Sequence, residues 1–456
     1  MKTILFLTLL FLSTTASAQL FNIDHLAASD VSGVLEINSG DFDQDGDQDL
    51  FTITSQLVAW YENLDGLGTF APPTTIETGM GQAFNQAVID LDEDGKEDLL
   101  ISYFDQGLIA YYRNLGDGNF APFQVLASGL NRASGIAPGD LDGDGDLDLV
   151  LGVSNGSGFY WIEQLANGSF SSLNPISTTL SGARKQVLGD IDGDGDLDIL
   201  TNSIGSILMS WFENVDGQGD FGEQHNIENS GFYESTFQLV DLDGDGDLDN
   251  VSSKEGNVLW RENLDGLGTF GVSQILFSSS DGSGLLNIHA ADIDNDGDQD
   301  ITFDSGFVHG KIYLLNNGDA TFSTNFVEPP EGGTTGNNIP PVDIDGDGDL
   351  DLISTSLFVN QGNRNDLYWY ENLTILGVSE FNIKGLKIYP NPAKDLLFIT
   401  SPEPIEKVTI YDLLGKRLLQ ENKKTEQINI SSLPAGLLFV EVKTNASTMV
   451  KKLLKE

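Results

Sequence analysis

Aspartates occupy every second position in the segment GDLDGDGDLDLVLG, which runs from residue 139 to residue 152. Two carboxylates about 4 Å apart repel each other by roughly 1 kcal/mol in water and by about 4 kcal/mol at an effective dielectric of 20. An apolar triplet, Leu149 to Leu151, follows at once and is typical of a buried strand. A folded loop with this charge density needs a positive charge among its carboxylates, so the segment predicts a cation site.

The segment recurs seven times, with first aspartates at residues 41, 90, 140, 190, 241, 292 and 343 and intervals of 49, 50, 50, 51, 51 and 51 residues. We call these segments loops 1 to 7 and number each from its first aspartate. Position 6 is glycine in all seven, and the predicted metal ligands stand at positions 1, 3, 5, 7 and 9. These are Asp41, Asp43, Asp45, Asp47 and Asp49; Asp90, Asp92, Asp94, Lys96 and Asp98; Asp140, Asp142, Asp144, Asp146 and Asp148; Asp190, Asp192, Asp194, Asp196 and Asp198; Asp241, Asp243, Asp245, Asp247 and Asp249; Asp292, Asp294, Asp296, Asp298 and Asp300; and Asp343, Asp345, Asp347, Asp349 and Asp351.

Alternating carboxylates, a glycine at the sharp turn and a backbone carbonyl at position 7 are the start of a calcium loop, and hard oxygen donors favour Ca²⁺ over softer metals. Position 12 is Thr52, Ile101 and Leu151 in the first three loops, so the bidentate glutamate of an EF-hand is absent and position 9 takes its place. We predict up to seven calcium ions. Position 7, which includes Lys96, contributes only its carbonyl and its side chains face solvent; the apolar position 2 anchors each loop. The alternative is a solvated acidic turn.

A second motif recurs with the same period as the loops. Two examples are WYENLDGLGTF at residues 60–70 and WFENVDGQGDF at residues 211–221. Each predicts a hairpin, with an aromatic-rich strand, a Gly/Asp turn and a second strand that begins with Phe. Each period therefore holds four short strands, and a constant period indicates a repeat architecture. Seven such units predict an all-β, seven-bladed β-propeller, with a β-solenoid as the alternative. Residues 20–29 resemble the strand that the seventh repeat lacks, so we expect the N-terminal strand to close the ring.

Composition limits the classes of function. The formal net charge is −48, which argues against recognition of a phosphate backbone. The chain has no cysteine, and residues 1–18 have the charge, apolar run and small-residue cleavage site of a secretory signal peptide. No later segment is apolar enough to span a bilayer. We expect an exported protein that is secreted or displayed on the cell surface, without nucleic-acid partners.

The repeats resemble the FG-GAP/VCBS family of calcium-bearing β-propellers, which is similar to the head of integrin α-subunits. The resemblance covers about residues 20–376 and implies metal binding at positions 1, 3, 5, 7 and 9; we assign residues 19–376 to this domain. Lys96 departs from the family pattern, and so does Asn250, which stands at an apolar strand position. The family includes adhesion modules, carbohydrate-binding modules and some lyases or dehydratases.

Composition changes after residue 376, because residues 378–456 carry 12 Lys/Arg against 9 Asp/Glu. Residues 377–385 form a predicted linker, and 386–456 alternate in short strands that predict a small β-sandwich. The segments LKIYPNPAKDLLFI, VTIYDLLGKRL and LPAGLLFVEVKT resemble the C-terminal sorting domain of type IX secretion in Bacteroidota. The resemblance implies recognition by the type IX secretion machinery and passage across the outer membrane.

Five residues before each loop, the repeats carry polar side chains that should ring the central channel of a propeller. Candidate ligand-binding residues are Glu36, Asn85, Lys185, Asn287 and Asn338, with Arg132, Arg184, Tyr233 and His289 nearby. No residue is predicted to be catalytic. We expect a binding or adhesion module for glycans or proteins; the alternatives are a polysaccharide lyase or sugar dehydratase acting at the channel mouth, and a structural surface protein. A basic residue beside Tyr or His would favour the enzyme.

Overall fold

The computed structural model describes residues 20–29, 31, 33–54, 57–204, 208–229, 236–279, 284–305, 311–327, 334–338, 340–358, 364–374, 387–389, 393–394, 396–400, 405–411, 416–422, 427–431, 433–434, 436–444 and 448–455. The predicted signal peptide, the predicted linker and Tyr233 lie outside these residues. Every regular element within them is a β-strand, which confirms the all-β prediction. No helix that could cross a membrane is present in this described part.

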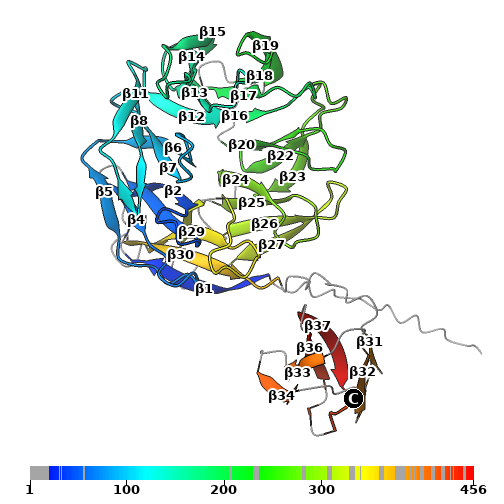
Figure 1. The fold of residues 1–456 in the computed structure, drawn as a ribbon. Helices are drawn as coiled ribbons and strands as arrows, with labels where there is room; N and C mark the ends of the chain where they lie inside the picture. The colour runs from blue at the N-terminus through cyan, green and yellow to red at the C-terminus, as the bar shows by residue number, and fades with distance from the viewer. Residues whose placement is uncertain are drawn as a thin grey trace, which may run out of the picture. The chain divides into compact units, whose positions relative to one another are not determined.

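The chain divides into two compact units, Met1–Leu373 and Thr374–Glu456. The first unit contains seven four-stranded antiparallel sheets, which we call blades 1 to 7 (Figure 1). Each blade begins with the strand that precedes an aspartate loop, and the loop leads directly into the second strand.

The blades have the following strands, in spatial order. Blade 1 contains β2 (Val34–Gly40), β3 (Asp49–Thr54), β4 (Leu57–Tyr61) and β5 (Thr74–Thr78). Blade 2 contains β6 (Ala83–Ile89), β7 (Asp98–Tyr103), β8 (Leu108–Tyr112) and β11 (Gln124–Ser128), with the hairpin β9 (Asn114–Gly116) and β10 (Asn119–Phe120). Blade 3 contains β12 (Ala133–Gly139), β13 (Asp148–Val153), β14 (Ser157–Ile162) and β15 (Asn174–Ser181). Blade 4 contains β16 (Ala183–Gly189), β17 (Asp198–Ser203), β18 (Leu208–Asn214) and β19 (Phe221–Asn229).

The remaining blades follow the same order. Blade 5 contains β20 (Phe237–Val240), β21 (Asp249–Lys254), β22 (Asn257–Arg261) and β23 (Gln274–Ser278). Blade 6 contains β24 (Leu285–Ala291), β25 (Asp300–Ser305), β26 (Lys311–Asn316) and β27 (Phe322–Val327). Blade 7 contains β28 (Thr334–Asn338), β29 (Leu352–Phe358), β30 (Arg364–Asn372) and β1 (Phe21–Ala28).

The blades form a closed ring. The first strand of each blade contacts the first strand of the next, and β28 of blade 7 contacts β2 of blade 1 (Figure 1). As the sequence predicted, the N-terminal strand β1 supplies the outer strand of blade 7, where it pairs with β30. This arrangement is the β-propeller, and the N-terminal strand completes the sheet whose other three strands lie between residues 334 and 372.

Burial explains the apolar runs that follow loops 2 and 3. Both faces of a blade pack against neighbouring blades, so all six residues of β7 are buried, and the same is true of β13. The outer strands β5, β11 and β23 are largely exposed.

An aromatic residue on the third strand packs against a hairpin glycine of the next blade. Gly118 of blade 2 lies over the ring of Trp60 of blade 1, so any side chain at position 118 would collide with the indole. Gly118 also has a φ of +66°, which favours glycine. Gly68 lies against Trp369 in the same way, which seals blade 1 to blade 7.

Asn250, which departs from the family pattern, has a buried partner. Its Oδ1 accepts a hydrogen bond of 2.9 Å from Nη1 of Arg261, the facing residue on β22. Arg261 stands where blades 1 and 2 have Tyr61 and Tyr112. The two polar substitutions in blade 5 therefore compensate each other, because an unpaired polar group at either position would be costly when buried.

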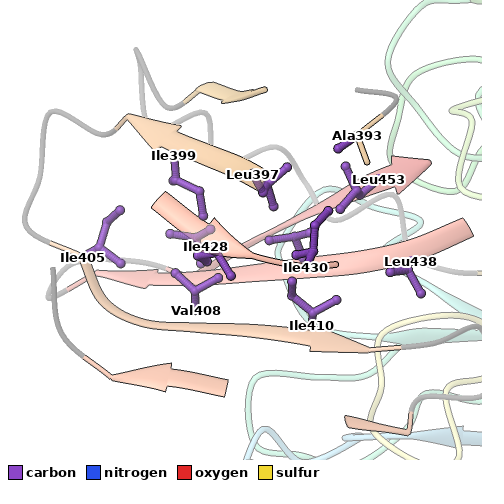
Figure 2. Packing of buried hydrophobic residues seen from close by; sticks show 12 residues of the cluster. Ala393, Leu397, Ile399, Ile405, Val408, Ile410, Ile428, Ile430, Leu438 and Leu453 are labelled. Atoms are coloured by element: carbon purple, nitrogen blue, oxygen red, sulfur yellow. The ribbon is translucent and has the colours of Figure 1, made fainter. Parts of the chain in front are cut away.

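The second unit has two sheets around one core (Figure 2). One sheet contains β31 (Lys387–Tyr389), β32 (Leu396–Thr400) and β35 (Gln427–Asn429), and the other contains β34 (Arg417–Asn422), β33 (Ile405–Tyr411), β36 (Gly436–Thr444) and β37 (Thr448–Lys455). Leu397 and Ile428 of the first sheet meet Ile410, Val440 and Leu453 of the second. The shared core explains the alternation of apolar residues along these strands.

Deleting residues 20–29 should destabilise the first unit, because β30 would lose its outer partner β1 and expose an unpaired edge that promotes aggregation. We expect a lower melting temperature and a loss of solubility relative to a chain that begins at Leu20. Thermal unfolding and light scattering of the two chains would test this. Equal melting and solubility would contradict a ring that depends on β1 for closure.

Candidate metal loops and central channel

Each aspartate loop turns at its position-6 glycine. The seven glycines have φ values between +83° and +100°, a conformation that side chains disfavour. Their N–H groups donate to Oδ2 of the position-1 aspartate at 2.8–3.1 Å. The position-7 N–H donates to Oδ1 of position 5, so the loop folds around its own carboxylates.

The position-9 aspartate fastens each loop to its blade. Its Oδ2 accepts from the position-2 N–H at 2.9–3.3 Å. Its Oδ1 accepts from a backbone N–H at the end of the third strand at 2.6–2.9 Å. All seven aspartates are buried, and the apolar position-2 side chains are buried too, which confirms their role as anchors.

The residue at the end of the third strand continues this contact into the preceding blade. Its side-chain amide donates to the position-2 carbonyl of the preceding loop at 2.8–3.3 Å in every blade. The donors are Asn63, Asn114, Gln164, Asn214, Asn263, Asn316 and Asn372. Asn63 of blade 1 reaches Ile344 of blade 7, so the series of hydrogen bonds closes around the ring. Sequence reasoning missed this role, although the amide recurs at a fixed place in every repeat.

The prediction that position-7 side chains face solvent is wrong. Six of them are half-buried and Asp349 is buried. The turn between the third and fourth strands lies over them, so that Gly217 approaches Asp196 and Gly266 approaches Asp247. Burial, together with the charge of Asp347, raises the pKa of Asp349 to about 8.

The loop carboxylates converge as a cation site requires. Oxygens of positions 1, 3 and 5 lie within 4.8 Å of one another in loops 1, 2, 4 and 5, and in loop 3 the same holds for Asp140, Asp142 and Asp148. Burial raises the pKa of Asp192, and the charge of Asp194 raises it further. In loops 4, 5 and 6, Oδ1 of position 3 is buried without a hydrogen-bond partner among the described residues. Unpaired buried oxygens and an all-oxygen donor set fit a hard divalent cation.

A cavity of about 490 Å³ lies among the first strands. Its lining includes four of the predicted ligand-binding residues, Glu36, Asn85, Lys185 and Asn287, together with Arg184, His289 and Thr236. The structure therefore brings together side chains that are separated by one to five repeats in the chain. Asn338 lies on β28, and Arg132 is not part of the lining.

Several channel residues already bind the neighbouring blade. Asn85 Oδ1 accepts from the Ile136 N–H at 2.8 Å, and Lys185 Nζ donates to the Phe237 carbonyl at 3.2 Å. Thr236 Oγ1 accepts from the Ile288 N–H at 3.2 Å. These contacts join first strands of successive blades, a role that the sequence did not indicate.

Glu36 differs from these residues because its side chain makes no hydrogen bond in the described part of the chain. Burial raises its pKa to about 7, although the charges of Lys185 and Arg184 act in the opposite direction. Burial lowers the pKa of Lys185 to about 8, and the charge of Glu36 limits that shift. The Arg184 guanidinium lies 4.2 Å from the ring centre of Phe84, which also lines the cavity.

Two families match the chain. The family described as an FG-GAP-like repeat matches residues 41–101, 90–151, 190–252 and 241–303, and the secretion system C-terminal sorting domain matches residues 387–456. The chain contains FG-GAP-like repeats and a secretion system C-terminal sorting domain. This confirms both resemblances seen in the sequence. The sorting domain directs export of the FG-GAP-like repeats by type IX secretion to the cell surface or the medium.

Solved structures share the fold of the FG-GAP-like unit at low identity. A lectin from Agrocybe aegerita, described for its recognition of non-reducing terminal N-acetylglucosamine, is 20% identical over 64% of this chain and 80% of that chain, with a TM-score of 0.50. BBS1N, solved in complex with ARL6DN, is 11% identical over 76% of this chain and 96% of that chain, with a TM-score of 0.52. PorZ of Porphyromonas gingivalis is 13% identical over 90% of this chain and 58% of that chain, with a TM-score of 0.46. A comparison with curated protein sequences found no match.

Substitutions at positions 9 and 5 should both destabilise the protein, but only the effect at position 5 should depend on bound calcium. Asp198→Ala leaves the N–H groups of Ile191 and Asn214 without acceptors, and each such loss costs about 1–3 kcal/mol when buried. We expect it to destabilise the protein with calcium and with chelator alike. Asp194→Ala removes an exposed carboxylate. We expect it to lower the melting temperature of the protein mainly when calcium is present. Thermal unfolding of both variants in calcium and in EDTA would separate them; an Asp198→Ala effect that disappears in EDTA would contradict the fastening role.

Proposed function

We propose that this protein is a calcium-stabilised binding module, exported by type IX secretion, whose ligand site is the cavity in the central channel. The observation that carries the proposal is Glu36, a carboxylate without a hydrogen-bond partner among the described residues, which faces Lys185 and Arg184 in a cavity of about 490 Å³. Cavities of this volume suit small ligands, and convergent polar groups give such a site its specificity.

Calcium is the cation that best suits the loops. Their donors are carboxylate and carbonyl oxygens with irregular spacing, which Ca²⁺ accepts and Mg²⁺ tolerates poorly. Up to seven ions would offset the repulsion among the carboxylates. The chain has no cysteine, so bound ions take the role that disulfides have in many exported proteins.

The lining favours a sugar as the ligand. It presents a carboxylate, two basic groups and amides, which are groups that donate to and accept from hydroxyls. The Agrocybe aegerita lectin, which recognises N-acetylglucosamine, shows that a related fold is compatible with sugar binding.

A second candidate function is an enzyme that acts on carbohydrate by proton transfer. It is favoured by Glu36 and Lys185, whose pKa values of about 7 and about 8 are near the operating pH that general acid–base catalysis requires. His289 and Arg184 line the same cavity. Turnover of a bound glycan, measured by mass spectrometry of the released sugar, would distinguish this function from simple binding.

A glycan array probed with the calcium-loaded full chain should identify bound glycans. Glu36→Gln should weaken the strongest interaction by about tenfold or more, because a hydrogen bond to a charged group contributes about 1.5–3 kcal/mol. Glu223→Gln on the exposed outer strand β19 is the matched control and should leave affinity unchanged. Binding that is equally strong in both variants would place the ligand site elsewhere.

Export provides a separate test. A chain that ends at Leu373 lacks the second unit and should fold but accumulate in the periplasm of a type IX-competent host, since it lacks the segment that the secretion machinery recognises. Immunoblots of periplasm, cell surface and medium would compare it with the full chain. Arrival in the medium at the level of the full chain would contradict the role of the sorting domain.

A further inference from the structure

Blade 2 reverses two charges that surround the other aspartate loops. The residue before the third-strand amide is Glu62, Glu163, Glu213, Glu262 and Glu371 in blades 1, 3, 4, 5 and 7. It is Leu315 in blade 6, but in blade 2 it is Arg113. Blade 2 also has Lys96 at position 7, where the other six loops have aspartate.

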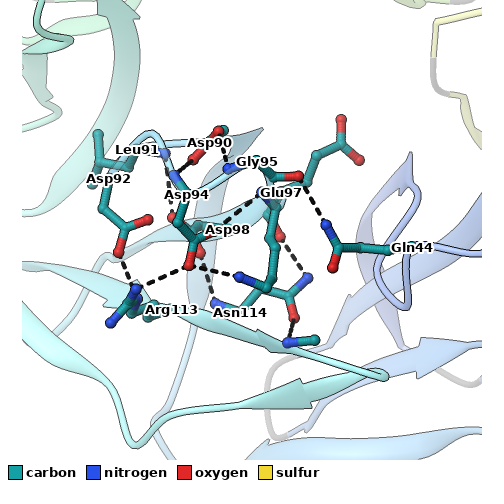
Figure 3. A network of polar contacts seen from close by, with 12 residues as sticks. Gln44, Asp90, Leu91, Asp92, Asp94, Gly95, Glu97, Asp98, Arg113 and Asn114 are labelled. Atoms are coloured by element: carbon teal, nitrogen blue, oxygen red, sulfur yellow. Dashed lines mark hydrogen bonds and ion pairs between the residues drawn. The ribbon is translucent and has the colours of Figure 1, made fainter.

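The two cations of blade 2 bind the carboxylates that would hold a metal ion. Arg113 Nε lies 2.5 Å from Asp92 Oδ2, and its Nη2 lies 2.9 Å from Asp94 Oδ2. Lys96 Nζ lies 2.8 Å from the same Asp94 oxygen. Figure 3 shows Arg113 pointing from the third strand between Asp92 and Asp94. Positions 3 and 5 of loop 2 are thus each engaged by a protein cation.

Loop 3 shows the usual arrangement. Its five motif positions and Glu163 are six acidic groups, whereas the same six positions of loop 2 are four aspartates and two cations. No basic side chain forms an ion pair with a carboxylate of any other aspartate loop in the described residues.

Loop 2 has two further acids, and neither restores the missing charge at the ligand positions. Glu97 Oε2 accepts from the Asp41 N–H of loop 1 at 2.7 Å, so it points toward the neighbouring blade (Figure 3). Glu93, at position 4, is exposed.

We infer that loop 2 is held together by Arg113 and Lys96 in place of a calcium ion, so that the propeller has one metal-independent loop. A divalent ion at this site would be repelled by two cations that lie about 3 Å from its ligand oxygens. This inference rests on the proposed calcium binding of the other loops. It also gives the residue before the third-strand amide a role in deciding which loops take an ion.

The test is the number of calcium ions bound per chain. Full-length protein and the double variant Lys96→Asp/Arg113→Glu would be dialysed against calcium buffer, and bound calcium would be measured by elemental analysis. The double variant restores the charges of the other loops and should bind one more ion than the wild-type protein. The single variant Asn295→Asp adds an acid at an exposed position 4 of loop 6 and should bind no more than wild type.

The reverse exchange gives a second, independent variant. Asp146→Lys/Glu163→Arg places the two cations of blade 2 in blade 3 and should bind one ion fewer than wild type. Equal calcium in wild type and both double variants would overturn the inference while leaving the calcium loops in place. Wild-type protein that binds no calcium would overturn the proposed metal binding itself, and the inference with it.

Hydrogen exchange provides a readout that does not depend on counting ions. After chelation, amides of loop 2 should keep their protection while those of loop 3 lose it. Loss of protection in loop 2 to the same extent as in loop 3 would overturn the inference.

Discussion

The position-9 aspartate is the contact on which the propeller depends. It accepts one hydrogen bond from its own loop and one from the third strand of its own blade, and the amide at the end of that strand binds the preceding loop. Backbone N–H groups buried between sheets need acceptors, and a short carboxylate supplies two at once. The same contact repeats in all seven blades, so the residues that fix each loop in its own blade also join it to a neighbouring blade.

This contact explains why crowded carboxylates lie beside buried strands. The aspartate that ends each loop must be buried to reach its donors, and the rest of the loop therefore lies at the edge of the hydrophobic core. There, repulsion between carboxylates is stronger than in water. In loop 2, Arg113 and Lys96 pair with these carboxylates, and we propose that a calcium ion offsets the repulsion in the other loops.

Polar side chains of the channel also accept hydrogen bonds from buried backbone groups, but not every one of them does so. Side chains such as Asn85 and Thr236 satisfy backbone groups of the neighbouring first strand, so they build the wall of the cavity. Glu36 occupies the equivalent place in blade 1 without such a partner, and it lies within reach of the charge of Lys185. Channel residues that share a sequence position therefore differ in what they offer a ligand.

The sequence by itself determined the repeat, the four strands per repeat, the closing role of residues 20–29, the sorting domain and the oxygen donors of the loops. These follow from period, alternation and residue type, which are local properties. Only the tertiary structure decided how position 7 is covered, where the third-strand amides bind and which channel side chains are already engaged. Each of these depends on contact between residues of different strands or blades, as when Asn214 meets the Leu141 carbonyl 73 residues away. The sequence marked Lys96 as an exception, but the approach of Arg113 to Asp92 and Asp94 required the third strand to lie beside the loop.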